Sequence, residues 1–354
     1  MDKNLSDKIR VVSFLLIILV IFLHSYNLID TIDTSKTLYN KSWVWFLQNF
    51  ISFGLTRIAV PIFFILSGYL FFLNINVGKE IFFTKIKKRV KTLLIPFLFW
   101  SLFGLGFYFI LQSIPQTARF FTKELIIDFS AQKFLKTIFI NPIPYQLWFI
   151  RDLIVLVFIS PIIYFCLNHF WKLTLLFFIV LWIFILNEFQ NSIEAALFFL
   201  IGSFFSLHNQ AVFEIKYEKE TNFFFVTWLG LVLLKTTFQY YNFEPMLCTA
   251  IFKLSIIIGI IAFWGGYDVF YKKSQVFINK LLQISSFTFF IFASHEPILT
   301  VLKKVLFIAL GKEYINYLEV YFLAPFTTIF ICVLVGFFLK KNLKFIYDII
   351  TGGR

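Results

Sequence analysis

The chain has 354 residues, of which 60% are hydrophobic and only 14% are charged, and its mean hydropathy is +0.84. A water-soluble domain of this length needs far more polar surface, so the composition excludes a soluble globular protein. The net charge of +13 would suggest nucleic-acid binding in a soluble chain, but here the basic residues lie in short loops between apolar runs, as membrane topology requires. We therefore expect an all-α polytopic membrane protein, with one integral membrane domain over residues 1–354 and no nucleic-acid partner.

A helix needs about 20 apolar residues to cross the hydrocarbon core of a bilayer. The sequence predicts about ten such spans, of which the fifth and sixth are short. In chain order they cover residues 11–29, 49–73, 92–113, 145–167, 173–187, 192–207, 222–240, 248–266, 281–302 and 317–339. The first apolar run lacks a small-residue cleavage site, so it is typical of a signal anchor rather than a cleaved signal peptide.

The distribution of Lys and Arg predicts the orientation. If the N-terminus is cytoplasmic, the cytoplasmic loops carry nineteen basic residues and the opposite loops, of similar total length, carry nine. The strongest single element is the run from Lys85 to Lys91. Because cytoplasmic loops carry the excess of basic residues in membrane proteins, we expect both termini in the cytoplasm.

Several ionisable residues lie inside the apolar runs. They are Arg57, Arg151, His24 near the end of the first run, and His295 with Glu296 beside it. A charge at the bilayer centre costs about 2.5–3.5 kcal/mol on insertion scales, so it needs a partner or a wet cavity. All lie at a similar depth in the outer half of the membrane, which favours a shared polar site over separate snorkelling side chains.

Other features of the apolar runs favour structural interpretations. Lys235 and Lys253 lie near membrane edges and are expected to snorkel, and Asp152 can serve as the counter-ion of Arg151. Soluble-enzyme motifs are absent: the chain contains no Gly-rich phosphate loop, no GxSxG and no HExxH. The cysteines at 166, 248 and 332 are isolated within apolar runs, so we expect neither a disulfide framework nor a metal site.

Three stretches together resemble the membrane acyltransferase-3 family. Residues 15–25 resemble its first helix with a terminal histidine, here His24, and residues 57–69 resemble its second helix, which begins here with Arg57 and ends in Ser67-Gly68-Tyr69. Residues 147–153 are similar to a Trp-Phe signature, with Trp148 and Arg151, and a weaker similarity surrounds His295. Family members often carry an arginine on the first helix where this chain has Ser13; Arg10 lies nearly a turn away.

The resemblance implies a ten-helix membrane enzyme that O-acylates surface carbohydrates. It implies acyl-CoA as the donor, with acetyl the expected group, and an envelope glycan or glycolipid as the acceptor, in a multi-pass protein of the bacterial cytoplasmic (inner) membrane. His24 is the candidate catalytic base, and Arg57 and Arg151 are candidates for binding a coenzyme A phosphate or the oxyanion. The remaining candidates for substrate binding are Ser67, Tyr69, Trp148, His295 and Glu296, of which the last two can orient a group or relay a proton.

Two other functions fit a polytopic protein with intramembrane charges. An exporter or flippase for a glycan or lipid-linked sugar would need many spans and buried charges too. Inverted repeats would favour that class, and the two halves of the sequence show no convincing correspondence. A purely structural scaffold would not need the intramembrane arginines.

Overall fold

The computed structural model describes residues 2–28, 42–75, 79–118, 121, 124–185, 189–215 and 219–353, and every regular element within these ranges is a helix. This confirms the expectation of an all-α polytopic bundle. The α-helices are α1 (Lys3–Ser25), α3 (Trp43–Ser52), α4 (Ala59–Phe72), α5 (Lys79–Arg89), α6 (Ile95–Ser113), α7 (Pro115–Ala118), α8 (Ala131–Phe139), α9 (Trp148–Phe158), α10 (Ser160–Phe184), α11 (Gln190–His208), α12 (Thr221–Tyr240), α13 (Pro245–Lys273), α14 (Gln275–Ile284), α15 (Thr288–Leu310), α16 (Asn316–Asn342) and α17 (Lys344–Thr351).

Nine helical segments of the described residues are long and apolar enough to cross a membrane, one fewer than the sequence predicts. The difference arises at the predicted spans 145–167 and 173–187. There the structure has α9, of only 11 residues, followed by α10, which continues to Phe184 through a break at Phe170. The end of the predicted span 173–187 lies outside the described residues.

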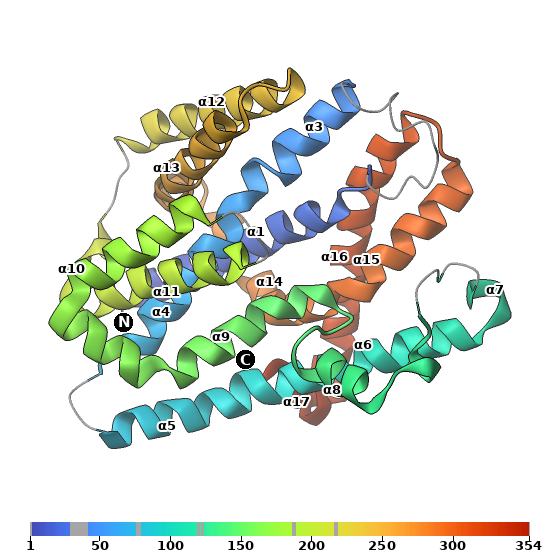
Figure 1. Ribbon diagram of the computed structural model, residues 1–354, viewed down its shortest axis with the longest axis horizontal. Coiled ribbons are helices and arrows are strands. Elements are labelled where there is room, and N and C mark those ends of the chain that lie inside the picture. Colours follow the sequence, from blue (N-terminus) through green and yellow to red (C-terminus); the bar gives the residue numbers. More distant parts are fainter. Residues whose placement is uncertain are drawn as a thin grey trace.

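Helix α1 runs through the middle of the bundle (Figure 1). It packs against α3, α4, α13, α14, α15 and α16, and its residues Val11, Leu16 and Ile21 are completely buried. Helices α10 and α16, in contrast, expose large apolar side chains such as Phe165 and Phe330. Apolar side chains on the outside of a bundle are stable in lipid, which is as apolar as they are.

Helices α14 and α15 pack beside α1 and run in the same direction. Near the start of α1, Arg10 Nη2 donates a hydrogen bond to the carbonyl oxygen of Leu282 at 3.1 Å. Near its end, Lys303 Nζ donates to the carbonyl oxygen of His24 at 3.0 Å. The last carbonyl groups of a helix have no partner within the helix, so this lysine satisfies one of them.

Close contact between α4 and α11 depends on two glycines. A Cβ atom at Gly202 would lie 1.9 Å from the carbonyl oxygen of Ile65, and one at Gly68 would lie 2.2 Å from the carbonyl oxygen of Phe199. Small residues allow membrane helices to approach backbone to backbone, which increases their van der Waals contact. The glycine of the Ser-Gly-Tyr motif is therefore a packing residue.

The buried lysines pair with protein groups rather than snorkelling. Lys235 Nζ donates to the carbonyl oxygen of Phe53 at 2.9 Å, and Lys253 Nζ donates to the carbonyl oxygens of Trp182 and Ile183 at the end of α10. The expectation for these two lysines is therefore wrong, because broken or ending helices leave carbonyl groups that need donors. Lys8, also buried, forms an ion pair with Asp268 at 2.7 Å.

Candidate active site

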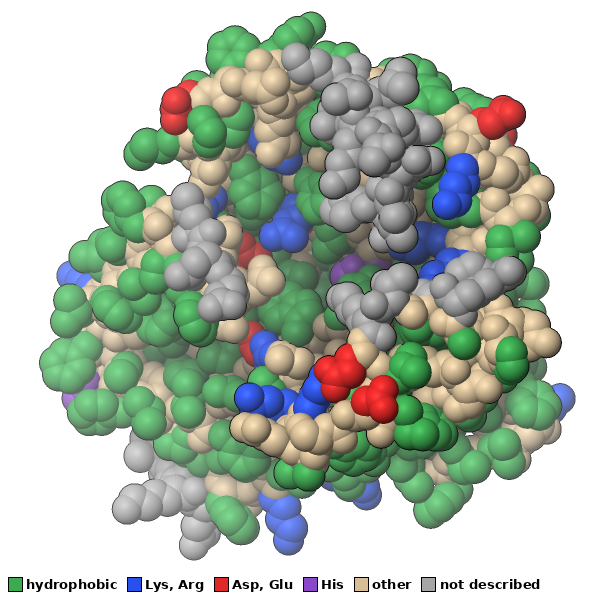
Figure 2. Space-filling view, turned by 45° about the vertical axis from the view of Figure 1, so that its right-hand side comes forward, with side chains coloured by type: hydrophobic (Ala, Val, Ile, Leu, Met, Phe, Trp, Pro, Cys, Tyr) green, Lys and Arg blue, Asp and Glu red, His purple; other side chains and the backbone are tan. Residues whose placement is uncertain are grey.

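A large cavity of about 1580 Å³ runs beside α1. It is lined at one end by Arg10 and Ser13, here called the Arg10 end, and at the other by His24 and Asn27, here called the His24 end. With a rise of about 1.5 Å per residue, the distance along α1 from Arg10 to His24 is roughly 21 Å. Figure 2 shows a hollow in one face of the molecule, with basic side chains and a histidine inside it.

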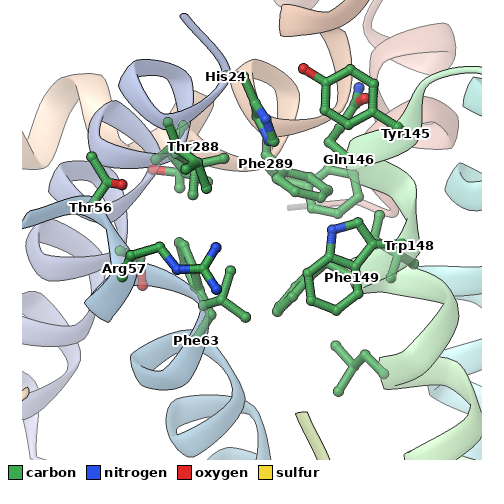
Figure 3. A pocket seen from close by; sticks show the side chains of 18 of the residues that line it. His24, Thr56, Arg57, Phe63, Tyr145, Gln146, Trp148, Phe149, Thr288 and Phe289 are labelled. Atoms are coloured by element: carbon green, nitrogen blue, oxygen red, sulfur yellow. The ribbon is translucent and has the colours of Figure 1, made fainter. Parts of the chain in front are cut away.

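His24 belongs to the last turn of α1, where its ring faces the cavity (Figure 3). The ring of Tyr145 meets it edge-on at a centroid distance of 4.7 Å. The ring of His295 stacks on it at 5.5 Å with an interplanar angle of 15°. Among the described residues, no side-chain or backbone group forms a hydrogen bond with the His24 ring nitrogens, so they are available to a substrate.

His295, which stacks on His24, lies next to a break in α15. Glu296 has non-helical angles (φ −100°, ψ 131°) and precedes Pro297, which has no N–H, so carbonyl groups one turn earlier lose their helical partner. His295 Nδ1 donates to the carbonyl oxygen of Phe292 at 2.7 Å. Gln146 Nε2 donates to that of Ala293 at 3.2 Å. Because a carbonyl oxygen can only accept, Nδ1 of His295 carries a proton in this contact.

Glu296 is joined to the same group of residues. Its Oε1 atom accepts a hydrogen bond from the Tyr145 hydroxyl at 3.1 Å, and Tyr145 in turn contacts the His24 ring. His295 and Glu296 are both buried and neither lines the cavity. The structure therefore places them directly behind the cavity wall, where they contact His24 and Tyr145, which line it.

Arg57 reaches the cavity from a break between α3 and α4. The chain there forms a short 3₁₀ turn, Leu55–Ile58, after Gly54. A Cβ atom at Gly54 would lie 2.3 Å from the carbonyl oxygen of Phe50, so only glycine fits the break. Arg57 points into the cavity, across from Trp148 (Figure 3). Its guanidinium forms no hydrogen bond or ion pair with a described residue. It lies over the ring of Phe252, with 5.6 Å between Arg57 Cζ and the ring centroid.

The two polar residues of the Ser-Gly-Tyr motif face different surroundings. Ser67 lines the cavity, whereas Tyr69 is buried and packs on Phe213 at a centroid distance of 4.1 Å. Successive helical residues are about 100° apart, so positions 67 and 69 point to nearly opposite sides of α4.

Arg151 does not line the cavity. Its Nε atom lies 2.8 Å from Asp152 Oδ1, and its Nη1 atom donates to the carbonyl oxygen of Ile140 at 2.6 Å. Asp152 also accepts from Ser192 at 2.7 Å, which connects α9 to α11. The neighbouring Trp148 does line the cavity, so the two candidates from this stretch differ in position.

Sequence reasoning did not single out several residues that line the cavity. These are Arg89, Tyr145, Gln146, Glu194, Lys303, Lys304 and Lys312. Glu194 lies inside the predicted span 192–207, so the cost of an intramembrane charge would have identified it. It is buried and accepts a hydrogen bond from Trp182 Nε1 at 3.0 Å. Arg10, left without a role by the family pattern, lines the cavity together with Ser13.

Charge in the cavity is strongly asymmetric. Its described lining residues include six basic side chains, Arg10, Arg57, Arg89, Lys303, Lys304 and Lys312, and one acidic side chain, Glu194. Within the described ranges, no three His, Cys, Asp or Glu side chains are grouped so that they could hold a metal ion. An imidazole with available nitrogens and an unpaired guanidinium can together remove a proton and stabilise a developing negative charge.

Comparisons with known proteins show the family of the chain. The chain is 27% identical over 372 aligned residues to the succinoglycan biosynthesis protein ExoH of Rhizobium meliloti (strain 1021), and the alignment covers 100% of this chain and 94% of that protein. No solved structure matches the chain significantly. The model of an acyltransferase domain matches residues 8–338, nearly the whole length. The chain therefore belongs to the membrane acyltransferase-3 family.

Proposed function

We propose that this protein transfers an acyl group, expected to be acetyl, from cytoplasmic acyl-CoA to a hydroxyl of an envelope glycan such as O-antigen, capsule or exopolysaccharide. The observation that carries the proposal is the cavity that joins Arg10 to His24 along α1. The family supports acyl transfer, and a relative named for succinoglycan biosynthesis supports a polysaccharide acceptor. We place the protein in the bacterial cytoplasmic membrane and treat residues 1–354 as one functional unit.

The excess of basic residues in the loops assigns the Arg10 end to the cytoplasm. Arg10 and Arg89 line the cavity there, and guanidinium groups bind phosphates through paired N–H donors. We assign them the phosphates of acyl-CoA. The distance of roughly 21 Å to His24 is most of the bilayer core of about 30 Å, so a donor with a long, thin arm can present its thioester far from its phosphates.

The reaction uses the available groups of the cavity. His24 removes the proton from the acceptor hydroxyl, and the oxygen attacks the thioester carbon. The carbonyl oxygen becomes negatively charged, and Arg57 stabilises it. The carbon–sulfur bond then breaks, the proton passes to the leaving thiolate, and the products are the glycan ester and free coenzyme A. The protonated imidazole supplies that proton, so His24 ends in its starting form.

The other candidates have supporting roles in this proposal. Trp148 and Ser67 contact substrate from the cavity wall. Tyr69 and Arg151 position α4 and α9, since their partners are protein groups. His295 and Glu296 orient His24 and Tyr145, because the stack and the hydrogen bond that join them are direct.

The His24→Ala variant tests the proposal. A general base contributes about 10²–10⁴-fold to rate, so we expect the variant to lose O-acylation of the surface glycan while the amount of glycan stays normal. The measurement is NMR of glycan from cells, with O-acyl signals and total polymer quantified separately. His169→Ala is the matched control, because His169 is exposed and lies outside the cavity lining.

Two results would contradict the proposal. Normal O-acylation in cells that carry His24→Ala would remove His24 from the reaction. Loss of the polymer from the surface, with an unchanged acyl content per repeat, would instead identify the protein as an exporter. Purified wild-type protein should also transfer radiolabelled acetyl from acetyl-CoA to the isolated glycan.

A further inference from the structure

We infer that the His24 end of the cavity binds a negatively charged group of the acceptor glycan, so that the substrate class is an anionic glycan. This inference rests on the proposed function and on the orientation given above. Its basis is the cluster of Lys303, Lys304 and Lys312, which line the cavity at this end.

The lysine closest to the reacting group is Lys303. Its Nζ atom lies 3.0 Å from the backbone oxygen of His24, so its positive charge lies directly beside the proposed base. Lys304 and Lys312 are exposed, and both also line the cavity. The one acidic residue of the described lining, Glu194, is buried against Trp182 of α10. Basic side chains therefore outnumber acidic ones by six to one in the described lining.

Structural roles explain this cluster only in part. Lys303 caps α1, and Lys304 Nζ lies 5.6 Å from the ring centroid of Phe121. Neither role requires the charges to line a cavity, and neither applies to Lys312. Basic residues are depleted from the outer side of membrane proteins, so two lysines near the end of α15, Lys303 and Lys304, and Lys312 just after it oppose the general bias. A binding role accounts for that exception.

The chemistry of lysine indicates the kind of ligand. An ammonium group is a compact point charge on a flexible stem and does not impose the fixed geometry of a guanidinium. Such a cluster suits anions of varied shape, and its field raises the local concentration of an anionic substrate. On an envelope glycan the anion is either an acid on a sugar, such as a uronate, or the diphosphate of a lipid carrier.

The test measures binding by the full-length protein in phosphatidylcholine nanodiscs. The probes are oligogalacturonate and its neutral methyl ester, and farnesyl diphosphate and its neutral alcohol, farnesol. The variants are K304Q/K312Q and, as a control with the same loss of charge at the other end of the molecule, K272Q/K273Q. An exposed charge pair contributes up to about 1 kcal/mol, so we expect the affinity for an anionic probe to fall by about 5-fold to 25-fold in K304Q/K312Q only.

Each possible result of the binding experiment supports or contradicts the inference. A loss confined to oligogalacturonate supports a sugar acid as the ligand, and a loss confined to farnesyl diphosphate supports the lipid carrier. Equal binding of charged and neutral probes overturns the inference. So does weaker acetyl-CoA binding in K304Q/K312Q, which would assign this end to the donor, or an effect that appears only when phosphatidylglycerol is added, which would assign the lysines to lipid.

A separate assay distinguishes failure of this inference from failure of the proposed function. Wild-type protein is incubated with radiolabelled acetyl-CoA and the isolated glycan. Absence of transfer, with lysine-dependent binding of the anionic probes retained, would contradict acyl transfer and leave the anion site in place. Transfer to the glycan without any preference for anionic probes would contradict only the anion site.

Discussion

Replacement of Gly202 by alanine should separate α4 from α11. The added Cβ atom would lie 1.9 Å from the Ile65 carbonyl oxygen, whereas carbon–oxygen contacts between helices are about 3.3 Å or longer, so the helices must move apart locally by roughly 1.4 Å. Overpacking of a tight contact costs about 1–3 kcal/mol. The carbonyl oxygen of Ile65 is a backbone atom, so it cannot rotate away from the added Cβ atom as a side chain could.

A matched control exists in Gly230→Ala. Nothing lies within 4 Å of a Cβ atom added at Gly230, which is inside α12. Alanine is favoured over glycine within a helix by about 0.5–1 kcal/mol, so this variant should be as stable as wild type or more stable. Thermal unfolding in detergent, followed by the fluorescence of the 8 tryptophans, compares the two variants.

The separation should also lower activity, since α4 supplies Ser67 and α11 supplies Glu194 to the cavity. We expect Gly202→Ala to lose acyl transfer at temperatures where it is still folded. If Gly202→Ala and Gly230→Ala unfold at the same temperature, the close helix contact does not exist and this reasoning is refuted.

Three further predictions concern charges. Arg57→Lys should lose most of the activity that Arg57→Ala loses, about 10²–10³-fold in acyl-transfer assays, because lysine retains the charge but lacks the donor fork; full activity of Arg57→Lys would show that any cation suffices. Lys8→Met should destabilise the protein by about 3–5 kcal/mol by leaving Asp268 buried and unpaired, and the double variant Lys8→Met/Asp268→Leu should recover much of this loss; thermal unfolding that shows additive losses would contradict the pairing. Reporter fusions should place residues 85–91 in the cytoplasm and residue 130 outside, and the opposite readout at the basic run would reverse the two ends of the cavity.

The sequence was most informative where a single ionisable residue lies within an apolar run. His24 and Arg57 stand out because ionisable groups are costly in apolar helices, and the structure brings both to one cavity. His295 stacks on His24, although their separation in sequence gives no hint of that contact. A proline inside a helix bends or breaks it, and the break in α15 lies at Glu296, directly before Pro297.

Residues whose position depends on long-range packing could not be predicted. Tyr145 and Gln146 lie in a turn before α9, and their hydrogen bonds reach across about 150 positions to the break in α15. The pairing of Arg151 with the adjacent Asp152 was expected from the sequence, but the absence of Arg151 from the cavity lining was not. The position of a residue within an apolar run predicts its depth in the membrane, whereas the face of the helix that meets a cavity depends on the neighbouring helices.

A cavity of about 1580 Å³ that extends along most of a membrane-crossing helix also affects the electrical insulation of the bilayer. A volume of this size, with charged side chains among mostly apolar ones in its lining, has room for water, and a continuous file of water would conduct protons and small cations down the membrane potential. Fixed positive charges along a pore raise the electrostatic barrier to such ions. The basic side chains at both ends and at Arg57 would therefore oppose the passage of protons and small cations through a water-filled cavity.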